Sequence, residues 1–186
     1  MAGDDKNDSE AARRFRDAAL PHLDDVFTLA QYLMRNRADA EDAVQECYLR
    51  ALRHFDSYRG PAMKPWLLTI LRNICNAEFA RRSKREVLVD APLEELTAEE
   101  TPTWQEPATS PEAAMLRQQD DNAIRRMIAA LPAPFREVIV LREINDLSYG
   151  EIAQVAGVPV GTVMSRLARA RSMLRSAWNV AEGAAP

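Results

Sequence analysis

A short stretch near the C-terminus, SYGEIAQVAGVPVGTVMSRLARARSML at residues 148–174, constrains the fold more than any other part of the sequence. Ser148 and Glu151 have the S-x-x-E spacing of a capping box, in which each side chain accepts a hydrogen bond from an exposed amide of the first turn. Gly157 follows at the place where a left-handed residue ends a short helix. A longer basic helix then runs to about Trp178. A short capped helix, a glycine-containing turn and a longer helix together predict a helix-turn-helix.

The longer helix gathers positive charge, and no acidic residue occurs from Pro159 to Asn179. Its arginines are Arg166, Arg169, Arg171 and Arg175. At 100° per residue one apolar stripe faces the core, formed by Val163, Leu167, Ala170 and Leu174. The opposite face, with Ser165, Ala168, Arg169 and Ser172, is small and polar at its centre, with arginines around it. Such a face fits the DNA major groove, which is about 12 Å wide. The alternative is a solvated basic face on an ordinary bundle helix, and the capped helix and glycine turn favour DNA.

The formal net charge of −4 hides an uneven distribution. Residues 86–121 alone carry −9, contain four prolines and show little periodicity, so they are interpreted as a flexible acidic linker. The remainder carries +5 and its bases cluster, which indicates nucleic-acid contact by part of the chain. Helical blocks flank the linker at 10–85 and 122–179, and strand-like alternation is almost absent. We therefore predict an all-α protein of two small helical domains.

Several classes of protein are excluded by what the 186 residues lack. No apolar run approaches the roughly 18–20 residues that span a bilayer, and the acidic N-terminus has no apolar signal segment, so we expect a cytoplasmic protein without membrane insertion. Cys47 and Cys75 lie far apart, and His22 and His54 have no metal-like spacing. We expect no metal, cofactor or catalytic residue, because no Ser/His/Asp or Cys/His constellation occurs, and hence no enzyme.

The N-terminal block is predicted to hold three or four helices, at about 20–34, from Asp39 onward and at about 66–82. The outward side of the helix from Asp39 carries acids, an amide and an exposed leucine: Asp42, Gln45, Glu46 and Leu49. This pattern indicates a docking face for a basic protein partner. A solvated face with one stray leucine is the alternative.

The helix at 66–82 presents a polar stripe of Thr69, Arg72, Asn73 and Asn76. Amides and a hydroxyl beside a Gly/Pro loop and a basic terminus suit contact with unpaired bases and phosphates. Trp66 lies on the apolar side and is expected in the core. Tyr58, in the preceding loop, is a candidate for base stacking.

Three segments together resemble the extracytoplasmic-function group of bacterial sigma factors: RADAEDAVQECYLRAL, PWLLTILRN and LPAPFREVIVLREINDLSYGEIAQVAGVPVGTVMSRLARARSML. The resemblance covers about residues 10–85 and 122–178. It implies two helical domains, joined by a flexible linker, that carry core RNA polymerase to promoter DNA. An anti-sigma protein that covers both binding faces is a further partner common in this group.

The resemblance also implies roles for individual residues. The face of Asp42, Gln45, Glu46 and Leu49 would dock on the clamp of the polymerase β′ subunit. The loop 57–65 and the helix from Trp66 would melt and read the −10 element, with Asn73 as the best base contact. Ser165, Arg166 and Arg169 would contact the −35 element, and Arg136 would contact a phosphate. The remaining predicted DNA-binding residues are Thr162, Arg171 and Arg175.

Departures and rivals leave alternatives open. Met164 stands where the group often has a basic residue, and Ala168 where a larger one is frequent. One −35 contact is thus either lost or replaced by an apolar contact with a thymine methyl.

One rival function is a stand-alone helix-turn-helix regulator that binds a palindrome as a dimer. A second is an adaptor that sequesters an anti-sigma protein without reading DNA, against which the arginines argue.

Overall fold

The computed structural model describes residues 4–34, 36–60, 62–88 and 122–183 of the chain, and every regular element in these ranges is helical. The all-α prediction is confirmed. Most of the predicted acidic linker lies outside the described residues, so the division at 10–85, 86–121 and 122–179 stays a prediction. Within the described ranges no helix is long and apolar enough to cross a membrane.

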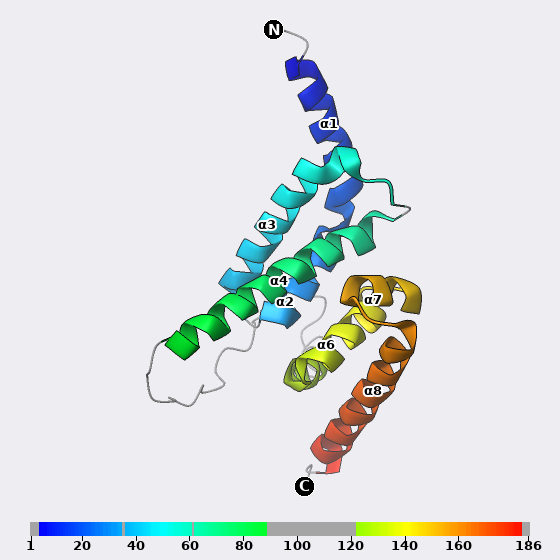
Figure 1. Cartoon of the computed structure of the whole chain (residues 1–186). Helices are drawn as coiled ribbons and strands as arrows, with labels where there is room; N and C mark the ends of the chain where they lie inside the picture. The colour runs from blue at the N-terminus through cyan, green and yellow to red at the C-terminus, as the bar shows by residue number, and fades with distance from the viewer. Residues whose placement is uncertain (1–3, 35, 61, 89–121, 184–186) are drawn as a thin grey trace, which may run out of the picture.

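The first block contains four α-helices and two short 3₁₀ turns. In chain order they are α1 (Asp4–Ala19), the turn Leu20–His22, α2 (Leu23–Met34), α3 (Arg37–His54), the turn Phe55–Ser57 and α4 (Met63–Leu88). The expected helix from residue 20 starts three residues later, because Pro21 occupies the 3₁₀ turn that separates α1 from α2. Figure 1 shows α2, α3 and α4 side by side, with α1 extending from them to the N-terminus.

The start of α3 corrects a second boundary. Asn36, not Asp39, is the N-cap: its side chain accepts a hydrogen bond of 3.1 Å from the backbone N–H of Asp39. Asp39 therefore lies inside the first turn, where its charge favours the helix dipole. Its carboxylate is also 2.8 Å from the guanidinium of Arg82, so it ties the start of α3 to the later part of α4.

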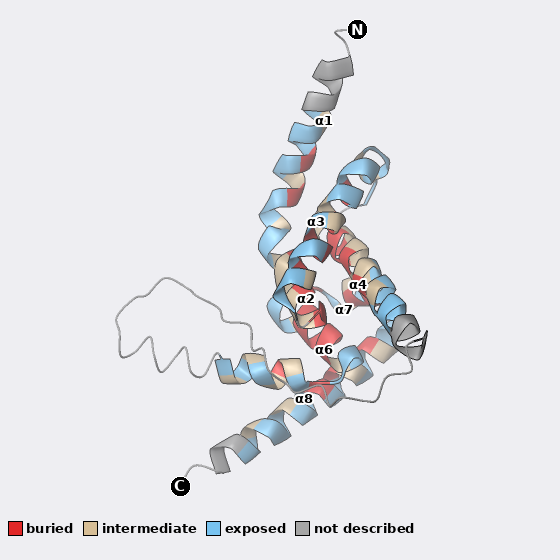
Figure 2. Cartoon of the chain, turned by 90° about the vertical axis from the view of Figure 1, so that its left-hand side faces the viewer, coloured by how far each residue is buried: buried red, intermediate tan, exposed pale blue. Residues whose placement is uncertain are grey.

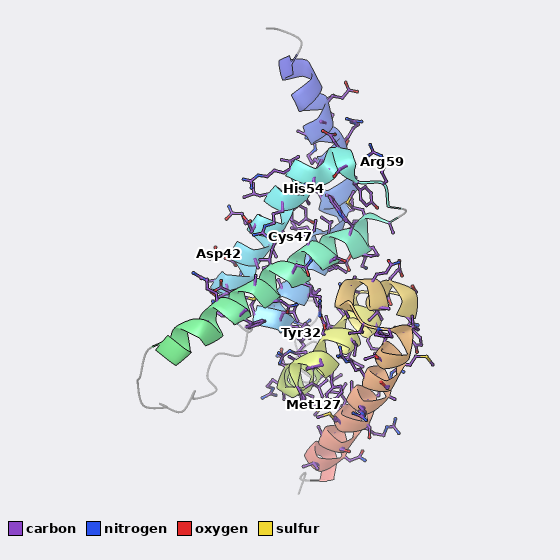
Figure 3. The ribbon with its side chains drawn as sticks, viewed as in Figure 1. Tyr32, Asp42, Cys47, His54, Arg59 and Met127 are labelled. Carbon is purple, nitrogen blue, oxygen red and sulfur yellow. The ribbon has the colours of Figure 1, made fainter. Side chains whose placement is uncertain are left out.

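The core of the first block is formed by α2, α3 and α4, with α1 added at one end. Phe15 of α1 packs edge to face against the rings of Tyr48 and Phe55. The Tyr48 hydroxyl donates a hydrogen bond of 3.0 Å to the carbonyl of Ala19, which fixes the end of α1. Cys47 lies between α3 and α4, as Figure 3 shows, and donates its S–H to the carbonyl of Leu67. Burial raises the pKa of this thiol to about 12, so it stays protonated.

The second block begins with a helix at 122–130. It continues with α6 (Ala133–Ile139), one π-helical turn (Val140–Ile144), α7 (Tyr149–Ala156) and α8 (Val160–Gly183). Pro132 caps α6 and separates it from the preceding helix, as the sequence predicted. The π-helical turn ends in a 3.0 Å bond from Asn145 N–H to the carbonyl of Val140. Asp146 follows with a φ of 55°, and this left-handed residue turns the chain toward α7.

The helix-turn-helix is built as predicted. Ser148 and Glu151 form the complete capping box at the start of α7. Gly157 ends α7 with φ 62° and ψ 37°, a conformation that costs an L-residue with a side chain more than it costs glycine. Of the predicted core stripe of α8, Val163, Leu167 and Ala170 are fully buried, and Leu174 is half-buried against the core.

The two blocks share one continuous hydrophobic core. In the first view α6 and α7 lie directly beside α2 and α4, while α8 points away from them (Figure 1). The turned view places buried residues where α2 and α4 face α6 (Figure 2). Polar contacts cross the same boundary: the side-chain amide of Asn145 donates to the backbone carbonyl of Asp25 at 3.1 Å. The Asp25 carboxylate lies 2.8 Å from Lys64 of α4, so three elements meet at this acid.

Candidate nucleic-acid interface

The outward face of α8 carries the first group of predicted DNA contacts. Ser165 and Arg169 are exposed, and Thr162 and Arg166 are half-buried. The Ser165 hydroxyl donates to the carbonyl of Thr162 at 3.0 Å, which leaves its lone pairs toward solvent as acceptors. The predicted recognition face is therefore open, with the buried stripe on the opposite side holding α8 to α6 and α7.

The two shoulder arginines of α8 differ in their surroundings. Arg171 donates from Nη2 and Nε to one oxygen of Glu143 on the π-helical turn, at 2.7 and 3.1 Å. This hydrogen bond raises the pKa of the Arg171 guanidinium and holds α8 against the π-helical turn. Arg171 as a DNA contact stays a prediction, one that needs this pair to open. Arg175, one turn later, is exposed.

Arg136 requires a correction. Its side chain is buried, with 3% of the residue exposed. Its Nη1 donates to the carbonyls of Ala129 and Leu131, at 2.7 and 3.2 Å. Ala129 lies in the last turn of the 122–130 helix and Leu131 directly follows it, where carbonyls lack intrahelical donors. We therefore replace the predicted phosphate contact by a structural role. From its position on α6, the Arg136 guanidinium satisfies the carbonyls at the C-terminal end of the preceding helix.

The stripe on α4 is divided by its contacts. Asn73 and Asn76 are exposed. Thr69 instead donates its hydroxyl to the carbonyl of Pro65 at 2.7 Å. Arg72 is paired through Nε with the carboxylate of Glu137 on α6. Of the four predicted contacts, the two asparagines have side chains facing solvent in this arrangement.

The loop before α4 is folded onto the helix. The ring of Tyr58 packs on Trp66 with centroids 4.7 Å apart and planes tilted by 36°. Arg59 stabilises the loop by donating to the carbonyls of Asp56 and Tyr58, at 2.6 and 2.9 Å. Figure 3 places Arg59 and His54 at this end of the α3–α4 pair.

A cavity of about 430 Å³ lies between this loop and the helix-turn-helix. Tyr58, Trp66 and Thr69 line it from the first block, and Glu151 and Gln154 of α7 line it from the second. The Tyr58 hydroxyl is buried and has no hydrogen-bond partner among the described residues. Sequence reasoning missed the α7 wall, because no local pattern shows which distant helix covers a loop.

The predicted docking face lies on the solvent side of α3. Asp42 and Gln45 are exposed, and Leu49 keeps 45% of its surface in solvent. Glu46 is half-buried and pairs with Arg50 at 2.6 Å. Figure 3 shows Asp42 on the side of α3 away from α4. The four predicted residues are thus brought together on one face.

Comparison with known proteins assigns both blocks. The sequence profile of sigma-70 region 2 matches residues 19–85, and that of sigma-70 region 4 matches residues 121–174. The RNA polymerase sigma-H factor of Pseudomonas aeruginosa is 32% identical over 89% of this chain and 86% of its own length. The ECF RNA polymerase sigma factor SigW of Bacillus subtilis is 32% identical over 91% of this chain and 90% of its own.

The chain belongs to the extracytoplasmic-function group of sigma factors.

A solved relative has the same architecture. The sigma factor RpoE from Bartonella quintana, crystallised in complex with the anti-sigma factor NepR, aligns with a TM-score of 0.73 and 27% identity. The alignment covers 90% of this chain and 98% of that one. Sigma factors are transcription initiation factors, and this chain directs promoter-specific initiation by RNA polymerase.

In this sigma factor the basic end of α4 is partly neutralised within the helix, which the sequence reading did not anticipate. Glu78 accepts from Arg81 at 2.8 Å and from Arg82 at 2.9 Å, and these bonds lower the pKa of its carboxyl to about 2. The signal was present as the i,i+3 and i,i+4 spacing of Glu78 to the two arginines. Because Arg82 also holds Asp39, this arginine stabilises the region 2 bundle as well as adding positive charge.

Proposed function

We propose that this sigma factor binds core polymerase through the α3 face and reads its promoters with α4 and α8. The observation that supports this most strongly is the recognition face of α8. Ser165 and Arg169 are exposed there, on a helix without an acidic residue from Pro159 to Asn179. Such a face attracts phosphate and leaves hydrogen-bonding groups free for base edges.

The −10 element is assigned to α4 on narrower grounds. Asn73 and Asn76 are the exposed amides of the stripe, and an amide both donates to and accepts from a base edge. Single-stranded bases present those edges only after the duplex has melted. We therefore assign base capture to Asn73, and phosphate contact to Arg72 once it leaves Glu137.

Polymerase docking is assigned to Asp42, Gln45, Glu46 and Leu49. An exposed leucine between acids and an amide combines apolar contact with attraction to a basic partner. We propose that the chain works in the cytoplasm, where bacterial polymerase transcribes, and supplies no catalytic group of its own.

An anti-sigma protein is the proposed regulatory partner. Support comes from the Bartonella relative, whose crystal structure contains one. The partner is expected to cover both the α3 face and the α8 face, and so to block polymerase docking and promoter reading together.

The test is transcription in vitro with the full-length protein, bacterial core polymerase and a library of genomic promoter fragments. A sigma factor gives transcripts from a defined subset of fragments, and core polymerase alone does not. The matched assay measures duplex binding by the protein without polymerase. Tight binding to a palindrome by the protein alone, with no promoter-directed transcripts, would establish the stand-alone regulator instead.

A further inference from the structure

The recognition helix carries an apolar strip that the arginine contacts leave unexplained. Val160, Met164 and Ala168 are spaced four residues apart and are all exposed. Met164 keeps 54% of its surface in solvent and Val160 keeps 44%. Residues at this spacing lie one above the other on a helix face, so the three form one continuous apolar strip.

The strip does not belong to the core. The buried stripe of α8 is Val163, Leu167 and Ala170, each fully covered by the rest of region 4. At 100° per residue Met164 lies about 100° from both Val163 and Ser165, between the buried side and the recognition face. It therefore borders the surface that faces DNA.

The charge around the strip indicates what covers it. At 100° per residue Arg171 and Arg175 lie within about 20° of Met164, on the strip's side of α8. Arg175 is exposed, and Arg171 is exposed and pairs with Glu143. A partner that buries this strip also meets those cations, so a polyanion fits better than an apolar protein surface. Within the major groove of DNA the C5 methyl of thymine is the apolar group that a base edge presents.

We propose that Met164, flanked by Val160 and Ala168, contacts thymine methyl groups in the −35 element and selects thymine at one or two positions. The proposal rests on the promoter-reading role of α8 proposed above. An unbranched thioether with three rotatable bonds adapts to a methyl at varied depth. The arginines and Ser165 supply polar contacts beside it, so one helix reads methyl groups and hydrogen-bonding edges together.

The experiment removes the methyl and nothing else. Holoenzyme formed from the full-length protein and core polymerase first selects its −35 sequence from a randomised duplex library. Each thymine of the selected element is then replaced in turn by deoxyuridine, and holoenzyme binding is measured. We expect a loss of about fourfold at one or two positions, the effect of one buried methyl. Met164→Ala should bind the thymine and deoxyuridine duplexes equally at those positions.

Two further variants provide the controls. Met173, 40% exposed on the same helix, lies nine residues along and so on the opposite side of α8. Met173→Ala should keep the full difference between thymine and deoxyuridine. Met164→Leu keeps an apolar side chain of similar size and should restore part of the difference that Met164→Ala removes. Circular dichroism of each variant checks that α8 is intact.

The outcomes separate this proposal from the function on which it rests. If the holoenzyme selects no −35 sequence, the promoter-reading role of α8 fails. If it selects one but no deoxyuridine weakens binding, or if Met164→Ala keeps the deoxyuridine effect, methyl reading by Met164 is overturned while promoter reading stands. A Met164→Ala variant that loses affinity for core polymerase, with unchanged methyl sensitivity, would assign the strip to a protein contact.

Discussion

Arg72 of α4 and Glu137 of α6 form an ion pair that joins region 2 to region 4. The pair is well covered, with 21% of the arginine side chain and 10% of the glutamate side chain exposed. The guanidinium also lies beside the turn of the helix-turn-helix, 3.7 Å from the position that a side chain on Gly157 would take. A residue predicted to contact the −10 element thus also holds region 4 against region 2.

Glu137→Gln should weaken this packing, because it leaves a half-buried guanidinium without its counter-charge. We expect a loss of about 1–3 kcal/mol in the free energy of unfolding, measured by urea titration with circular dichroism. The matched control is Glu143→Gln. Both side chains of the Glu143–Arg171 pair are exposed, so this substitution should lower the free energy of unfolding by less than about 1 kcal/mol. Equal losses in the two variants would mean that Arg72 and Glu137 contribute no more than a surface pair.

Polymerase docking is tested on the α3 face. Combining Gln45→Arg with Leu49→Asp should weaken binding to core polymerase at least tenfold while helicity is kept, because both side chains are exposed. Leu23→Asp on α2 is the control, since Leu23 is 41% exposed and Leu49 is 45% exposed. Fluorescence titration of labelled protein with core polymerase measures both. The docking assignment does not survive if both variants bind as well as wild type.

Asn73→Ala should reduce open-complex formation far more than closed-complex binding, because unpaired bases exist only after melting. Permanganate reactivity of the −10 thymines reports the first quantity and filter binding the second. Asn76 is an exposed amide one turn along α4, and Asn76→Ala measures how much this neighbouring side chain contributes to open-complex formation. Equal losses in both assays for Asn73→Ala would argue against base capture.

Arg169 and Arg175 should separate sequence reading from phosphate contact. Arg169 points away from the buried stripe, and a bidentate arginine–guanine pair discriminates by about 1–3 kcal/mol. Arg169→Ala should therefore flatten the preference for the natural −35 sequence over a scrambled one. Arg175→Ala should weaken both equally and lower the salt slope by about one phosphate. The measurement is holoenzyme binding to both sequences across a salt series. If Arg169→Ala lowers only the salt slope and keeps the sequence preference, Arg169 is a phosphate contact and not a base contact.

The capping box predicts a pH dependence. The hydrogen bond from Ser148 lowers the pKa of Glu151 below its ordinary 4.5. Because the folded-state pKa is depressed, the stabilisation is present above pH 4.5 and is lost as pH falls through the folded-state value. Ser148→Ala should cost about 1 kcal/mol at neutral pH, and the difference from wild type should shrink in acid. Ser176→Ala, on the exposed side of α8, should show no such trend in urea titrations at matched pH.

Local patterns predicted the parts of the fold that local chemistry determines. The capping box and Gly157 define α7 from a few residues, and the spacing of Val163, Leu167 and Ala170 gives the buried side of α8. Partners distant in sequence were not predictable in this way. Asn145 donates a hydrogen bond to Asp25, 120 residues earlier in the sequence, and no periodic pattern in the sequence indicates that Arg72 pairs with Glu137. Arg136 was misassigned for the same reason, because an arginine that caps carbonyls and one that binds phosphate look alike in sequence.

The contact between α4 and α7 has a consequence for promoter occupancy. Elements centred near −35 and −10 are about 25 base pairs apart, or roughly 85 Å of duplex at 3.4 Å per pair. The 33 residues from 89 to 121 could span at most about 110 Å if fully extended, so their length permits one chain to hold both elements. Helices in direct contact cannot be 85 Å apart, so if α4 and α8 read the two elements as proposed above, occupying both elements separates α4 from α7. The apparent promoter affinity is then the intrinsic affinity multiplied by the fraction of chains already separated. Substitutions that weaken this buried contact, although far from any base, should therefore tighten promoter binding.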